Sequence, residues 1–109
     1  MDNTIIIKLL FQGTKGVVLE GTKLKSCNST PIALSIPKGV SVLEKGCFSG
    51  QDSLERIYLP SSIIEVEPMC FANCPNLGLI KCHSNLRKYE NILKYGNNAR
   101  VVYVDSKES

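Results

Sequence analysis

The sequence predicts a short, mostly β, right-handed repeat solenoid of the α/β type, with one parallel sheet and a cap at each end. One observation is a fixed offset of 23 positions between recurring residues: Ile36-Pro37 and Leu59-Pro60, Glu44 and Glu67, and Cys47-Phe48 and Cys70-Phe71. The other is the aliphatic spacing L-x-x-L-x-L within the unit, which is typical of one strand per repeat. Each unit of such a chain contacts only its neighbours, so the fold builds a continuous surface.

The composition is that of one globular domain. The chain has 109 residues, of which 43% are hydrophobic and 21% charged, both ordinary values. The net charge of +3 is small for a dedicated nucleic-acid binder. There is no run of 18 apolar residues, so we expect no membrane-spanning helix. The N-terminal segment begins acidic and is interrupted by Lys8, unlike a signal peptide. With no export signal, the odd number of five cysteines favours a reducing compartment, and we expect a cytoplasmic protein.

Residues 1–30 are predicted to form an N-terminal cap of β-hairpin type. Strands are expected over residues 5–11 and 17–24, and the turn over residues 12–16, where glycines supply the turn dihedral angles. A cap is required because the first coil of a solenoid would otherwise expose its apolar cross-section.

The first full repeat is placed at residues 31–53 and the second at residues 54–76. Strand alternation predicts that Arg56 and Tyr58 face solvent while their neighbours point inward. Pro60 ends this strand because proline has no N–H to donate. The inward positions predicted for the two repeats are Leu34, Ile36, Val40, Leu43, Cys47 and Phe48 in the first, and Leu54, Ile57, Leu59, Ile63, Val66, Cys70 and Phe71 in the second.

A third repeat begins at residues 77–83 and then changes character. Ser84 is the predicted N-cap of a helix, and Gly96 with Asn97 is the predicted stop. A final strand is expected over residues 100–104, so residues 84–104 form a helix-plus-strand C-terminal cap and residues 105–109 a polar tail. The apolar residues that recur at helical spacing are Leu86, Tyr89, Ile92 and Leu93.

Residues 36–50 and 59–74 resemble the BspA-like leucine-rich repeat. The family pattern is roughly I-P-x-x-V-x-x-I-x-x-x-A-F-x-x-C-x-x-L-x-x-I, and the likeness is clear over residues 34–82. The family alanine is cysteine here, at both Cys47 and Cys70. The resemblance implies a leucine-rich-repeat fold that binds rather than catalyses. Many members of this family are long arrays at the cell surface that work as adhesins.

Residues that could carry chemistry do not form a recognisable site. Cys70, Cys74, Cys82 and His83 are zinc-type ligands, but the spacing C-x3-C-x7-C-H matches no compact zinc module. Adjacent Cys82 and His83 on a strand would point to opposite faces. A cysteine nucleophile needs a neighbouring base, and the chain has one histidine. We therefore expect no metal, no cofactor and no enzymatic activity.

The C-terminal third combines basic and aromatic residues, as single-strand nucleic-acid binders do. Tyr89, however, falls on the apolar stripe of the predicted helix, and the charges fit its solvated face. Nucleic-acid binding is therefore the less favoured interpretation of this group: Arg87, Lys88, Lys94 and Arg100 with Tyr89, Tyr95 and Tyr103.

The favoured functional surface is the outward face of the sheet. Tyrosine and arginine are enriched at interface hot spots, and an exposed leucine adds apolar area. Any such sheet has outward residues, however, and six of them cover less than a standard interface, so loops and caps would have to join in. The outward positions that stack in successive repeats are Ala33 and Ser35, then Arg56 and Tyr58, then Leu79 and Lys81.

These observations predict a non-catalytic protein-binding module, namely a small intracellular inhibitor or adaptor that covers part of a larger protein. A phage or another mobile element is a fitting source for such a protein. One alternative is a structural solenoid that assembles as a homodimer. Another is a fragment of an adhesin-type surface array, although the divergent segment at residues 84–104 argues against it.

Overall fold

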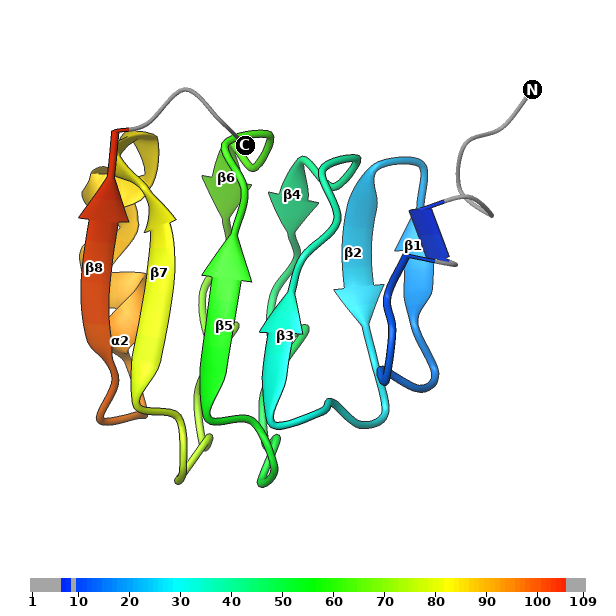
Figure 1. Cartoon of the computed structure of the whole chain (residues 1–109), viewed down its shortest axis with the longest axis horizontal. Helices are drawn as coiled ribbons and strands as arrows, with labels where there is room; N and C mark the ends of the chain where they lie inside the picture. Colours follow the sequence, from blue (N-terminus) through cyan, green and yellow to red (C-terminus); the bar gives the residue numbers. More distant parts are fainter. Residues whose placement is uncertain (1–6, 9, 106–109) are drawn as a thin grey trace.

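The strands of the computed structural model, which describes residues 7–8 and 10–105, form two four-stranded sheets that run along the molecule (Figure 1). The first sheet has the order β1-β2-β4-β6, and the second sheet has the order β3-β5-β7-β8. The first sheet holds β1 (Val18–Glu20), β2 (Lys23–Ser26), β4 (Val42–Leu43) and β6 (Glu65–Val66). The second holds β3 (Ala33–Ser35), β5 (Arg56–Leu59), β7 (Leu79–His83) and β8 (Arg100–Val104).

The 23-residue offset of the sequence is the register of strand pairing in both sheets. Ala33 pairs with Arg56, which pairs with Leu79 in turn, and Leu43 pairs with Val66. All these pairings are parallel. Each repeat therefore adds one strand to each sheet. The sequence reasoning predicted the second sheet but not the first, whose repeat strands β4 and β6 are two residues long.

The core lies between the two sheets, and every inward position predicted for the two repeats is buried. Phe48 and Phe71 are fully buried, and their rings stack with centroids 5.6 Å apart and planes inclined by 5°. The cysteine before each ring repeats this contact, because Cys47 Sγ lies 3.9 Å from Cys70 Sγ. The recurring Cys-Phe pair is therefore a stacking contact between consecutive repeats.

The N-terminal hairpin lies later in the chain than predicted. Its antiparallel strands are β1 and β2, joined at Gly21-Thr22, and β2 also pairs in parallel with β4. Of the strand predicted over residues 5–11, residues 5, 6 and 9 lie outside the described residues. The rest is turn-like rather than extended, because Leu10 and Phe11 donate backbone hydrogen bonds back to residues 7 and 8. A short apolar run fits a strand or a buried helical turn equally well by periodicity.

The C-terminal segment consists of the 3-10 helix η1 (Ser84–Tyr89), the α-helix α2 (Glu90–Lys94) and β8, which pairs in parallel with β7. The predicted N-cap at Ser84 is wrong. His83 keeps the extended backbone of β7 and is the capping residue, since its Nδ1 accepts the N–H of Asn85 at 3.2 Å. Gly96, with a φ of 77°, follows α2 as predicted. No helix in the described part of the chain is long and apolar enough to cross a membrane.

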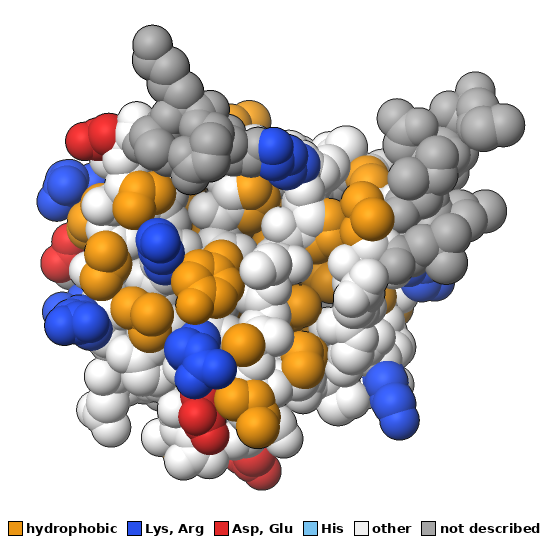
Figure 2. Space-filling model, in the orientation of Figure 1, with side chains coloured by type: hydrophobic (Ala, Val, Ile, Leu, Met, Phe, Trp, Pro, Cys, Tyr) orange, Lys and Arg blue, Asp and Glu red, His pale blue; other side chains and the backbone are white. Residues whose placement is uncertain are grey.

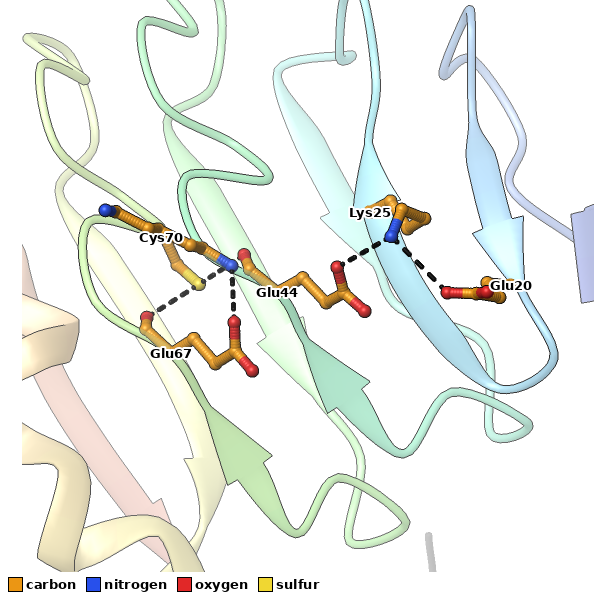
Figure 3. Close-up of polar contacts among 6 residues, drawn as sticks. Glu20, Lys25, Glu44, Glu67 and Cys70 are labelled. Carbon is orange, nitrogen blue, oxygen red and sulfur yellow. Dashed lines mark hydrogen bonds and ion pairs between the residues drawn. The ribbon is translucent and has the colours of Figure 1, made fainter.

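Charged side chains link the strands of the first sheet (Figure 3). Lys25 Nζ lies 3.4 Å from Glu20 Oε1 and 3.1 Å from Glu44 Oε1. Glu67, the counterpart of Glu44 one repeat later, accepts the backbone N–H of Lys45 through Oε1 at 3.0 Å. Exposed ion pairs add little stability. The recurring glutamate is best understood as a link between its own unit and the preceding one.

Candidate functional site

The six residues predicted as a binding surface lie together on the outer face of the second sheet. The strand register aligns them in two rows that cross β3, β5 and β7. Four of the side chains are exposed, and those of Tyr58 and Leu79 are half-buried. The first row is Ala33, Arg56 and Leu79, and the second row is Ser35, Tyr58 and Lys81.

Basic and hydrophobic side chains intermix over this face (Figure 2). Lys81 Nζ lies 6.0 Å from the centroid of the Tyr58 ring on the neighbouring strand, at the outer limit of a cation–π contact. One guanidinium nitrogen of Arg56 is 4.0 Å from a carboxylate oxygen of Glu55, and the Arg56 side chain stays 48% exposed. Lys81 is thus held near Tyr58, and both cations remain accessible to a partner.

Strand β8 widens the face by a fourth column that the sequence reasoning missed. Arg100 pairs with Leu79, Val102 with Lys81, and Val104 with His83. Arg100 is exposed, and the two valines are half-buried. A strand over residues 100–104 was predicted, but as part of a cap. The signal that could have placed it is its run of β-branched and aromatic residues over 101–104, which suits a half-buried strand.

A hollow with a volume of about 270 Å³ opens at the carboxyl ends of the four strands of the second sheet. Three residues of the predicted surface, Ser35, Tyr58 and Lys81, line it. Lys38 and His83 also line it, and the sequence reasoning assigned neither of them to the surface. Lys38 follows the proline that ends a strand, and His83 was weighed only as a metal ligand or base. No Asp or Glu of the described part of the chain is among the lining residues.

The cysteines belong to the core. All five thiols are free, and all but Cys27 are buried. Burial raises the pKa of the Cys27 and Cys82 thiols to about 11. The pKa of the Cys47 thiol is raised well above its usual value, mainly by burial and also by its hydrogen bond to Cys70. Since the thiolate is the nucleophile, these three thiols are poorly reactive near neutral pH.

Metal-ligand side chains are dispersed in this structure. Among residues 7–8 and 10–105, no three side chains of the His, Cys, Asp and Glu types are grouped as a metal site would require. Cys82 is buried and His83 is half-buried, and both are among the residues that line the hollow.

Comparison with known families identifies the repeat. The model of the BspA type leucine-rich repeat region matches residues 20–106 in six copies, which extends the likeness beyond residues 34–82 at both ends. No curated protein and no solved structure matches the chain. Leucine-rich repeats are in general protein-interaction modules and typically have no catalytic activity. Because the match covers well over half of the sequence, this chain belongs to the BspA-type leucine-rich-repeat family.

Proposed function

We propose that this protein is a short right-handed solenoid with a cap at each end, and that the outer face of its second sheet binds a protein partner without catalysis. The observation that carries the proposal is the position of Tyr58 beside Lys81 and two residues along β5 from Arg56, on a sheet face that no described helix or strand covers. Arginine and tyrosine are the residues most often found at the energetic centre of protein interfaces.

The lack of a covering layer supports the same proposal. Parallel sheets are usually covered on both faces. The second sheet is covered on its inner side by the core, whereas no helix or strand of the described chain lies over its outer face (Figure 1). A partner protein would supply the missing layer. A standard interface buries about 800 Å² of accessible surface on each partner, which is more than a tenth of the 6068 Å² of accessible surface of this molecule. The exposed residues of β8 would therefore have to take part in the interface.

A face of this kind acts by covering or holding its partner, which is how an inhibitor or an adaptor works. We therefore favour an inhibitor or adaptor over an enzyme. Five free thiols, four of them buried, are compatible with a reducing intracellular compartment.

Affinity capture with matched variants tests the proposal. The wild type, the Arg56→Ala/Tyr58→Ala variant and the control variant Lys94→Ala/Tyr95→Ala are immobilised in parallel, and the bound proteins are quantified by mass spectrometry. The control removes a cation and an exposed tyrosine from the C-terminal helix and the residue after it. We expect one protein retained by the wild type and the control but lost by the face variant. Equal retention by all three, or loss by the control alone, would contradict the proposal.

Sedimentation velocity tests the homodimer. A sedimentation coefficient that does not change with concentration excludes self-association. A coefficient that rises with concentration in the wild type, but not in Arg56→Ala/Tyr58→Ala, would make the partner a second copy of this chain.

A further inference from the structure

We infer that the hollow at the carboxyl ends of β3, β5, β7 and β8 is a carboxylate-binding subsite, which receives an aspartate or glutamate side chain from an extended acidic segment of the partner protein. This inference rests on the proposed function, because the hollow adjoins the proposed binding face and shares Ser35, Tyr58 and Lys81 with it.

The charges of the lining favour an anion. Lys38 and Lys81 are the charged side chains among the described residues that line the hollow, and none of these lining residues is acidic. The ion pairs among the described residues involve Lys25 and Arg56 as the cations. Neither Lys38 nor Lys81 is therefore paired with a carboxylate of a described residue. Hydroxyl groups of the lining add further hydrogen-bond donors. Cations and donors without a local carboxylate attract a negatively charged ligand into a concave site.

The size of the hollow selects a single side chain. Its volume of about 270 Å³ is below the roughly 300–1,000 Å³ of sites for drug-sized ligands and cofactors. Leu59, Pro60 and Val104 form part of the wall, against which the methylene groups of a glutamate can pack. The hollow therefore suits one carboxylate on a short apolar stem.

The rest of the face indicates an extended peptide. Arg56 lies two residues before Tyr58 on β5, and the Tyr58 row contains Lys81. Residues two apart on an extended chain are about 6.6 Å apart and point to the same side. A segment that runs along the strands with acidic residues at alternate positions would therefore present one carboxylate to the Arg56 row and the next to the Lys81 row.

A peptide fits this face better than a nucleic acid. Single-strand binders combine a cationic groove with several aromatic rings on which successive bases stack. Here Tyr58 is the aromatic residue of the face, and Leu79 and Val102 lie beside it. A mixed surface with one ring and several aliphatic side chains suits alternating acidic and apolar residues of a protein.

Titration with defined peptides, followed by NMR of the ¹⁵N-labelled protein at low ionic strength, tests the inference. The probes are acetyl-Ser-Glu-Leu-Glu-Leu-Ser-amide and the same peptide with glutamine for glutamate. We expect the glutamate peptide to shift backbone amide signals of residues 35–38, 58–61 and 81–83, and the glutamine peptide to bind at least about tenfold more weakly. Lys38→Gln/Lys81→Gln should weaken binding of the glutamate peptide at least about fivefold, because one partly exposed ion pair can contribute up to about that factor and the variant removes two cations.

Lys23→Gln/Lys94→Gln is the matched control, because it removes the same charge from exposed positions on β2 and α2. Its dissociation constant should stay within about twofold of the wild type. Equal binding of the two peptides, an equal loss in the control, or shifts elsewhere on the protein would overturn the inference. So would an oligothymidylate that binds more tightly than the peptide at the same amides, which would make the hollow a phosphate site.

The two proposals can fail separately. If a captured partner is lost by Arg56→Ala/Tyr58→Ala but binds Lys38→Gln/Lys81→Gln with unchanged affinity, the face is the interface and the carboxylate subsite is wrong. If both variants keep the partner at wild-type affinity, both proposals are wrong.

Discussion

The stack of Phe48 on Phe71 is the contact through which the 23-residue repeat should stabilise the fold, and replacing the rings one at a time and together measures it. Both side chains are fully buried, and their centroids are 5.6 Å apart. Leucine at either position keeps an aliphatic side chain in the core but removes the ring. We expect Phe48→Leu and Phe71→Leu each to lower the free energy of unfolding by about 1–2 kcal/mol.

The coupling between the two substitutions carries the information. A pair of stacked rings is worth about 0.5–1.5 kcal/mol beyond its area burial. The double variant has no pair left to lose, so it should be less destabilised than the sum of the single variants by about that amount. A domain of this length has a free energy of unfolding of about 5–16 kcal/mol, so the variants should stay folded.

Urea unfolding followed by far-ultraviolet circular dichroism gives the four free energies of the cycle. Phe11→Leu with Phe71→Leu is the control cycle, because Phe11 is also buried but is not the partner of Phe71 in the stack. A coupling below about 0.3 kcal/mol between Phe48 and Phe71, or an equal coupling in the control cycle, would refute the assignment of the Cys-Phe pair as a stacking contact between repeats.

Three further predictions concern stability. Deleting residues 84–109 uncovers β7 and removes two fully buried leucines, so no cooperative thermal transition should remain, and a cooperative melt would contradict this. Gly96→Ala should cost more than Gly21→Ala in urea unfolding: both glycines have positive φ, but a Cβ at Gly96 would lie 2.8 Å from Ala72 Cα, whereas a Cβ at Gly21 meets nothing within 4 Å. Equal costs would refute the close packing. Burial raises the pKa of the Cys82 thiol from 9.0 to about 11, so the unfolded chain loses this proton first. The contribution of the protonated Cys82 thiol to the free energy of unfolding is fully present below pH 9. It falls by up to about 2.7 kcal/mol as the pH rises through 11. Urea unfolding of Cys82→Ala should show a smaller alkaline loss, and an unchanged loss would contradict this.

The repeated core was predictable because the period and the strand alternation act together. A residue such as Ile57 is placed inward both by its position in the repeat and by its neighbours Arg56 and Tyr58, and the register of β3, β5 and β7 follows from the same offset. The six face residues were placed together for this reason.

What the sequence could not predict has local physical causes. Strands β4 and β6 are too short to show any alternation. His83 rather than Ser84 caps the helix η1, because the extended conformation of β7 continues through His83 and the helix begins at Ser84. The hollow is built where four strands end, so its residues come from separate repeats and share no sequence pattern.

The affinity of the captured partner for the face variants tests the central claim most directly. With the partner purified, isothermal titration calorimetry compares the wild type with Arg56→Ala/Tyr58→Ala and with Lys94→Ala/Tyr95→Ala. If the second-sheet face is the interface, the face variant should lose at least about 2 kcal/mol of binding free energy, or roughly thirtyfold in affinity, and the control should bind like the wild type. A face variant that binds with wild-type affinity would show that the partner is held elsewhere on the molecule.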